Sequence, residues 1–175
     1  MTKLNKLFPC IVLCSILAVS CGVFKQQPTT QQRIDKKALD LANLKGAAVE
    51  SVTLKDGAVA LKVTFDSGIL FGFNQSDLSE EAKQSLSHLV KGIADRPDSK
   101  IRVYGHTDIV GSAEANQAVS TKRAKEVARY LEEKGIDASR IEATGMSFNQ
   151  PVADNSTEAG RAKNRRVEIF VIPAQ

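Results

Sequence analysis

A short polar run in the second half of the chain has the residue types and spacing to hold a small charged ligand. Asp108 ends the run Gly105-His106-Thr107-Asp108, and Arg123 follows fifteen residues later. The carboxylate of Asp108 can bind an ammonium group, and the planar guanidinium of Arg123 can hold a carboxylate through two parallel hydrogen bonds. A zwitterion carries both groups, so this pair of residues suits a zwitterionic ligand.

The same two residues admit a plainer interpretation. Structural ion pairs between carboxylates and guanidinium groups are common, so Asp108 and Arg123 could instead form a salt bridge that fixes the loop to the following helix. The residues alone leave both interpretations open. An empty binding site could also contain that salt bridge.

Other kinds of chemistry find less support in the sequence. His106 and Asp108 are two potential metal ligands on one loop, but no third ligand accompanies them, so we expect no metal. No nucleophile–base pair and no phosphate-binding loop can be recognised in the sequence. We therefore expect a binding protein without a cofactor rather than an enzyme.

The polar run lies between a predicted strand over 100–104 and a predicted helix over 113–134, which Gly135 ends. In a helical projection with Asn116 at zero, Arg123 falls at about 340°, nearly in line with Asn116 and beside the apolar stripe. The pattern therefore places Arg123 at the rim of the core, near the loop that carries Asp108. The apolar stripe consists of Ala124, Val127, Ala128 and Leu131.

The remaining elements follow from the same periodicities. Asp56-Gly57 is typical of a tight turn between two strands, and the β-branched residues on both sides predict a hairpin. Residues 66–77, rich in Gly and Asn, predict a loop. We predict a helix over 34–44, strands over 49–54 and 58–65, a helix from Ser79 that ends before Pro97, and strands over 140–144 and 166–172.

Composition and charge argue against a nucleic-acid partner. Aromatic residues make up 5% of the 175-residue chain, with no Trp, which is too few for a base-stacking surface. The net charge of +4 falls to +2 when residues 1–20 are removed. A basic cluster contains no interleaved aromatic residues and is therefore interpreted as a solvated surface rather than a nucleic-acid site. Its members are Arg161, Lys163, Arg165 and Arg166.

Residues 1–20 predict a signal peptide, because a short basic leader precedes an apolar run too short to cross a bilayer as a helix. The run ends in Leu17-Ala18-Val19-Ser20-Cys21, which resembles the bacterial lipoprotein box. This resemblance implies a lipid on Cys21. An uncleaved anchor helix and an ordinary signal peptide are the alternatives. All three cysteines lie within residues 1–21, so the rest of the chain has no disulfide framework.

The second half of the chain closely resembles the OmpA C-terminal-like peptidoglycan-binding domain, which peptidoglycan-associated lipoproteins and flagellar stator proteins share. The family pattern GHTD-x-x-G-x(4)-N-x-x-[LV]-S-x-x-RA-x-x-V fits residues 105–127, with Val119 where Leu is usual. The NQP, GRA and NRRVE elements follow at 149–151, 160–162 and 164–168. The resemblance implies an α+β fold, a β-α-β-α-β-β domain with helices packed on a mixed sheet. Here the predicted short helix and hairpin precede it.

The resemblance also assigns the ligand site. It implies that Asp108 and Arg123 grip the diaminopimelate of the peptidoglycan stem peptide, and that Asn116, Thr107 and nearby backbone amides complete the pocket. Arg165 or Arg166 would flank the pocket. Phe71 and Phe73 are weaker candidates in the loop opposite.

The sequence therefore predicts a lipid-anchored protein of the bacterial outer membrane, with its domain in the periplasm. Its partners would be peptidoglycan, the membrane and other envelope proteins. A wall-anchoring part of a larger stator- or secretion-like machine is one alternative, and a peptidoglycan hydrolase is another. The expected organisation is a signal peptide over 1–20, a lipidated cysteine and tether over 21–34, a helix-and-hairpin extension over 35–62, and the OmpA-like domain over 63–173.

Overall fold

The computed structural model describes residues 44–71, 77–94 and 96–174. Three predictions lie outside this part of the chain. They are the signal peptide with Cys21, the tether, and all but the last residue of the helix predicted over 34–44.

A five-stranded sheet forms the centre of the fold, with the strand order β1-β2-β5-β3-β4. All neighbours pair antiparallel except β3 and β4, which are parallel. This is the mixed sheet that the sequence predicts. The strands are β1 (Ala47–Thr53), β2 (Val59–Asp66), β3 (Lys100–Gly105), β4 (Ile141–Gly145) and β5 (Arg166–Ile172).

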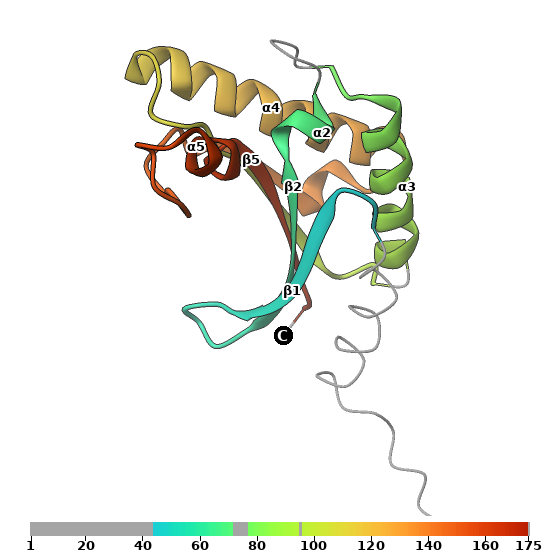
Figure 1. Ribbon diagram of the computed structural model, residues 1–175. Coiled ribbons are helices and arrows are strands. Elements are labelled where there is room, and N and C mark those ends of the chain that lie inside the picture. Colours follow the sequence, from blue (N-terminus) through green and yellow to red (C-terminus); the bar gives the residue numbers. More distant parts are fainter. Residues whose placement is uncertain (1–43, 72–76, 95, 175) are drawn as a thin grey trace, which may run out of the picture.

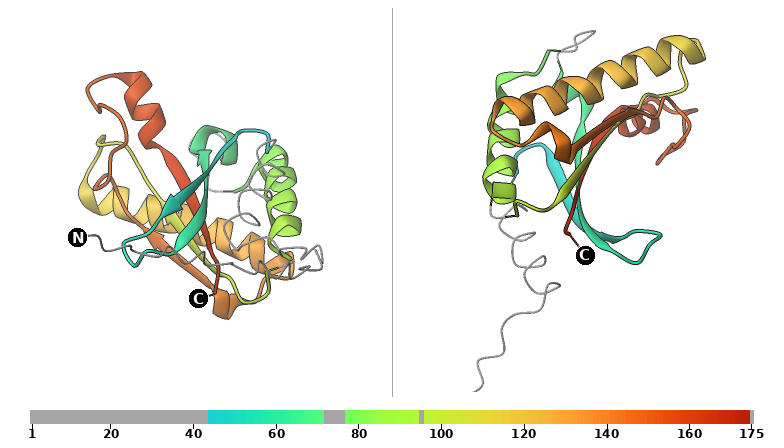
Figure 2. Two further views of the ribbon diagram at one scale, coloured as in Figure 1. Left: turned by 90° about the horizontal axis from the view of Figure 1, so that it is seen from below. Right: turned by 180° about the vertical axis from the view of Figure 1, so that it is seen from behind.

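Two long helices, α3 (Glu80–Ala94) and α4 (Ala113–Glu133), lie on one side of the sheet (Figure 1). Their apolar stripes share a single core with the inward side chains of the strands. Phe65, Ile101 and Ile169 are fully buried in it. The turn of the β1–β2 hairpin projects away from the helices (Figure 2).

The ends of both long helices follow the chemistry of their sequences. The hydroxyl of Ser79 accepts a hydrogen bond from the Ala82 backbone N–H at 3.0 Å and so caps α3. Ser112 caps α4 in the same way through Ala115, at 3.1 Å. Gly135 takes a φ of 94°, which allows the chain to turn just after α4. These helix boundaries are confirmed.

The predicted hairpin is present, but it does not stand apart from the rest of the fold. β2 pairs with β5 from Leu61 to Asp66, so the hairpin extends the same sheet. The boundary expected between residues 62 and 63 therefore falls inside β2.

Two short α-helices and a 3₁₀ helix, η1 (Ala138–Arg140), were not predicted. Of the two α-helices, α2 (Ser67–Leu70) lies where a loop was predicted over 66–77, and Asp66 caps it through Gly68 at 2.6 Å. α5 (Glu158–Asn164) directly precedes β5, and Thr157 caps it through Gly160 at 3.0 Å. Both α-helices are too short to show an apolar period. Within the described part of the chain, no helix is long and apolar enough to cross a membrane.

Candidate ligand-binding site

The predicted site lies where β3 ends and α4 begins, and two glycines bring these elements together. A Cβ atom on Gly105 would lie 2.2 Å from the carbonyl oxygen of Ser120. A Cβ atom on Gly145 would lie 2.5 Å from the backbone nitrogen of Thr121. Only glycine permits this close approach, so the first half of α4 rests directly on the ends of β3 and β4.

Internal hydrogen bonds hold the loop from residue 106 to residue 112 in place. Asp108 Oδ1 accepts from the backbone N–H of Val110 at 3.0 Å. The amide of Asn116 donates to the carbonyls of Val110 and Ser112 at 2.9 and 3.1 Å. Both amide hydrogens of Asn116 are therefore used within the loop. Asn116, predicted to complete the pocket, acts here by positioning Asp108.

Asp108 forms an ion pair with Arg165. Arg165 Nη1 lies 2.7 Å from Asp108 Oδ2, and its Nη2 donates to Glu158 Oε1 at 2.8 Å. The side chain of Asp108 is 11% exposed and that of Arg165 is 35% exposed. The salt bridge that the plainer interpretation assigned to Arg123 is thus made by Arg165 instead.

Arg123 is half-buried and lies over the ring of Phe71, with 5.4 Å between its Cζ and the ring centroid. Its Nε is buried and has no hydrogen-bond partner among the described residues. No carboxylate of residues 44–71, 77–94 or 96–174 lies within ion-pair distance of it. Burial lowers the pKa of Arg123 and the charge of Arg165 lowers it further, while Asp108 opposes both. Because guanidinium groups stay protonated in proteins, this is a charged group without a counter-ion in the described structure.

Thr107 contributes a second free polar atom. Its backbone N–H donates to the carbonyl of Ser147 at 3.0 Å, and the residue is 5% exposed. Its hydroxyl is buried and has no partner in the described part of the chain. Buried polar atoms are nearly always hydrogen-bonded, so free ones suggest a place that a ligand completes. The other buried side-chain atoms without a partner in the described structure are both ring nitrogens of His106 and the hydroxyl of Ser67.

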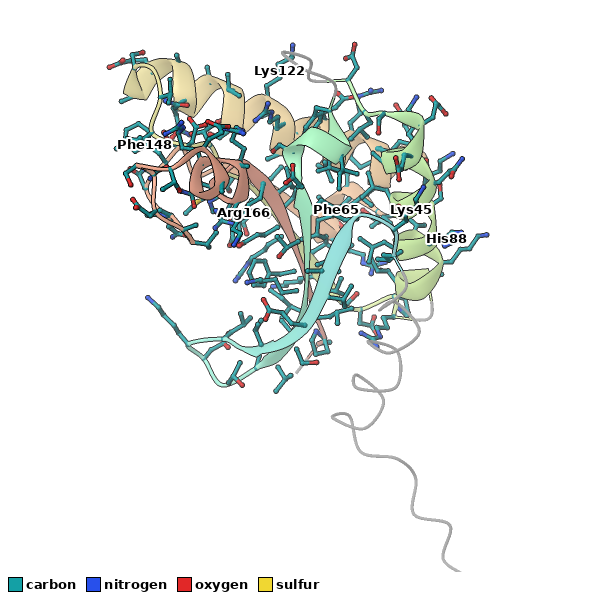
Figure 3. The ribbon with its side chains drawn as sticks, in the orientation of Figure 1. Lys45, Phe65, His88, Lys122, Phe148 and Arg166 are labelled. Carbon is teal, nitrogen blue, oxygen red and sulfur yellow. The ribbon has the colours of Figure 1, made fainter. Side chains whose placement is uncertain are left out.

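Arg166 does not flank this site. It begins the central strand β5, where it is 4% exposed (Figure 3). Its Nε donates to Glu168 at 2.9 Å, and its Nη2 donates to the carbonyl of Gln150 at 3.1 Å. Of the two arginines expected to flank the pocket, Arg165 contacts Asp108 and Arg166 contacts Glu168.

Arg166, Glu168 and His106 form a buried polar cluster on the sheet. His106 Nε2 lies 3.5 Å from Glu168 Oε2, and His106 is 1% exposed. Burial alone would raise the pKa of Glu168. The contacts with His106 and Arg166 outweigh burial and hold that pKa at about 2. Glu168 is therefore ionised at neutral pH.

The other predicted site residues divide as follows. Phe73 lies outside the described residues, whereas Phe71 is 1% exposed and lies against Arg123. Glu158 was missed because α5 was not predicted. Without that helix, a separation of seven residues from Arg165 gives no indication that the two side chains meet.

The structure gives no support to a metal site or to a large pocket at Asp108. Among the described residues, no group of three His, Cys, Asp or Glu side chains could hold a metal ion. The two hollows of note lie elsewhere. One, of about 560 Å³, lies between α3 and α4, and the other, of about 590 Å³, lies against β1, β2 and β5. The candidate site is a group of charged and polar side chains in which Asp108 and Thr107 are buried and Arg123 is half-buried.

Comparison with known proteins decides the family. The sequence model of the OmpA family matches residues 70–165, more than half of the chain, including every described residue of the site. The chain belongs to the OmpA family. The resemblance to the OmpA C-terminal-like domain is confirmed, and so is the predicted α+β fold.

Among its relatives in the OmpA family is the outer-membrane lipoprotein YfiB of Pseudomonas aeruginosa, which is 39% identical over 109 residues. The match covers 62% of this chain and 64% of YfiB. The chain thus spans less than two thirds of the length of this curated relative.

Solved structures of OmpA-like domains show the same fold. The cell wall anchor of the T6SS from Pseudomonas aeruginosa matches with a TM-score of 0.67 and 29% identity, over 85% of this chain and 100% of that one. The peptidoglycan-associated lipoprotein from Burkholderia pseudomallei matches with a TM-score of 0.55 and 29% identity, over 59% of this chain and 87% of that one.

Proposed function

We propose that this chain binds the peptidoglycan stem peptide non-covalently, through the zwitterionic end of diaminopimelate. The ammonium group of the ligand binds Asp108, and its carboxylate binds Arg123. The protein catalyses no reaction in this account; it holds the cell wall.

The observation that carries this proposal is the unpaired guanidinium of Arg123. A buried donor without a partner costs about 1–3 kcal/mol, and a protein of marginal stability retains few of them. A ligand carboxylate would supply the missing hydrogen bonds and the missing charge. Asp108, fixed by the Val110 N–H, offers an acidic partner within the electrostatic reach of Arg123. One anion and one cation side by side match a zwitterion better than a simple anion or cation.

The names of similar proteins support the same proposal. One solved relative is called a peptidoglycan-associated lipoprotein, and another is called a cell wall anchor. Both share the fold at 29% identity. The family match includes Asp108, Arg123 and Arg165.

We further propose that a lipid on Cys21 anchors the chain in the outer membrane, with the domain in the periplasm. Cys21 follows a leader of the lipoprotein type, and YfiB is an outer-membrane lipoprotein by name. The protein would then link this membrane to the wall. Replacing Cys21 with Ala should abolish incorporation of a fatty-acid analogue and release the protein into the soluble fraction. Labelling that persists in Cys21→Ala would refute the anchor.

Sacculus binding tests the proposed ligand directly. The chain with Cys21 replaced by Ala should sediment with purified sacculi, and free diaminopimelate should compete it off. Pimelate keeps both carboxylates of diaminopimelate but lacks its ammonium groups, and 1,5-diaminopentane keeps only the amines. Both should compete poorly, since each leaves one half of the site empty. Equal competition by all three compounds would rule out zwitterion recognition.

A second candidate function is wall anchoring within a larger envelope machine. The observation that favours it is the match to the T6SS cell wall anchor over that chain's full length. Purification of the lipidated protein from membranes distinguishes the two, because a machine component should co-purify with fixed stoichiometric partners.

A further inference from the structure

The strand β1 lies at one edge of the sheet, so one side of its backbone has no neighbouring strand in the described part of the chain. Native proteins usually protect such an edge with a short strand, a bulge, a proline, charged side chains or a covering segment. β1 is seven residues long, pairs with β2 in continuous register and contains no proline. Its one charged residue, Glu50, is paired with Lys62 at 2.7 Å. This edge can therefore accept another strand.

The register of the hairpin shows which backbone groups of β1 are free. The N–H of Leu54 donates to the carbonyl of Ala58 at 2.8 Å, so these residues form a hydrogen-bonded pair beside the turn. Such pairs alternate along an antiparallel ladder, so the even-numbered residues of β1 bond to β2 and the odd-numbered residues point their backbone groups outward. None of the described residues is a partner for the outward N–H and carbonyl groups of Val49, Ser51 and Thr53.

The strand at the other edge of the sheet, β4, is less suited to pairing. It has five residues, and the carbonyl of its last residue, Gly145, accepts a hydrogen bond from the side chain of Gln117 at 2.9 Å. In β1, Ser51 and Thr53 are exposed, and the turn that follows them projects away from the helices (Figure 2). β1 is thus both the longer and the more accessible edge.

Two copies of β1 complement each other. A two-fold axis at Ser51 places this residue opposite its own copy and places Val49 opposite Thr53 of the partner subunit. All three residues have outward backbone groups, so three hydrogen-bonded pairs with two bonds each give about six backbone hydrogen bonds. Glu50 then faces Val52 of the partner subunit. An axis at Glu50 would instead place two carboxylates opposite each other, which is unfavourable.

We propose that this chain forms a two-fold dimer in which β1 pairs antiparallel with β1 of a second copy. The two sheets then form one continuous sheet, and each β1 covers the open edge of the other. The site around Asp108 lies at the ends of β3 and β5, and β2 separates these strands from β1, so the dimer leaves the site accessible. Two sites in one particle would bind a polymer such as peptidoglycan with greater avidity than one site.

Disulfide cross-linking tests the register of this dimer. The three native cysteines, Cys10, Cys14 and Cys21, are replaced by Ala, so that Ser51→Cys supplies the sole thiol. Residues of a hydrogen-bonded pair have Cα atoms about 5.5 Å apart, a separation that suits a disulfide. We expect Ser51→Cys to form a covalent dimer in air with a copper–phenanthroline catalyst. Thr53→Cys is the matched control, because Thr53 is also exposed but would lie about 14 Å from its copy, too far for a disulfide.

Sedimentation velocity measures association without a cross-link. The mass of the cysteine-free chain should rise from one chain to two as its concentration increases. Ser51→Pro removes an N–H that points away from β2, so about two of the intersubunit hydrogen bonds are lost while the hairpin keeps its own. Its association constant should fall about 30-fold, with an unchanged circular dichroism spectrum. Ser51→Ala keeps the N–H and should associate within about twofold of the parent chain.

Three results would each overturn the proposal. They are a parent chain that stays monomeric at millimolar concentration, a Thr53→Cys variant that cross-links as completely as Ser51→Cys, and a folded Ser51→Pro variant that associates like Ser51→Ala. The first result would leave the edge of β1 to a strand of a different protein or to residues before 44.

Discussion

Two arginines that are neighbours in the chain show the two ways in which this fold uses charge. Arg165 is partly exposed and connects Asp108 to Glu158 at the proposed ligand site. Arg166 has a side chain only 5% exposed and is paired with Glu168 inside the sheet. Successive side chains at the start of a strand point to opposite sides, so one residue step separates the two environments.

The difference lies in how fully each group is satisfied. Arg166 has a carboxylate and two backbone carbonyls as partners, those of Asn164 and Gln150. At the proposed ligand site, Arg123 has a buried Nε and Thr107 has a buried hydroxyl, neither with a hydrogen-bond partner among the described residues. The Arg166–Glu168 pair is hydrogen-bonded and stabilises the fold, although both ring nitrogens of His106 beside it are buried without a hydrogen-bond partner in the described structure. The free groups at the candidate site leave bonding capacity for a ligand. Mutations in the buried pair should therefore mainly reduce stability, whereas mutations at the proposed ligand site should mainly reduce binding.

The largest expected effect is on stability, at the buried pair. Arg166→Ala removes the hydrogen-bonded ion-pair partner of Glu168 and leaves, among the described residues, only Lys62 at 3.8 Å and His106 at 3.5 Å, which should cost about 3 kcal/mol of unfolding free energy. Urea unfolding followed by circular dichroism measures this loss. Binding to sacculi by the protein that remains folded should stay close to wild type. A loss below about 1 kcal/mol would mean that the pair does not act as described.

The second prediction concerns acid. The pKa of Glu168 is lowered from 4.5 to about 2, so the folded state favours its charged form. This contribution to stability is complete above pH 4.5 and is lost as the pH falls from about 4.5 towards 2. It amounts to about 3 kcal/mol. Unfolding free energies measured across this range should fall steeply in wild type and less steeply in Glu168→Gln. Parallel curves would contradict the pairing.

The smallest effect is expected far from both regions, on the exposed side of α4. Arg129 pairs there with Glu126 and Glu133. Exposed ion pairs contribute little to stability, so Arg129→Ala should change the unfolding free energy least of the series. Its affinity for sacculi should stay within about twofold of wild type. A large loss of sacculus binding in Arg129→Ala would contradict the proposed location of the ligand site, because it would mean that the exposed side of α4 also contacts the ligand.

Much of the fold could be predicted from the sequence, because its signals are local. The helix start at Ser79, the stop at Gly135 and the apolar stripe of α4 all correspond to observed features. The projection also placed Arg123 correctly at the edge of the core. The short helices α2 and α5 were missed, since their stability comes from caps and tertiary contacts rather than from an apolar period.

The site was predictable only in part. Residue types identified Asp108 and Arg123, but not which cation would pair with Asp108. That choice depends on where β5 begins, which decides whether Arg165 or Arg166 faces the loop. It also depends on Glu158, which becomes a partner of Arg165 only through the turn that α5 makes. Contacts between residues far apart in the chain produce no periodic pattern that a single sequence could reveal.

The most direct test of the central claim measures sacculus affinity and unfolding free energy together for Asp108→Asn and Arg123→Ala. Hydrogen bonds to charged groups contribute about 1.5–3 kcal/mol, so each change should weaken binding roughly 10- to 150-fold while the protein stays folded. Arg123→Lys should restore little, because one ammonium cannot reproduce a two-pronged contact. Folded variants that bind sacculi as tightly as wild type would contradict the account.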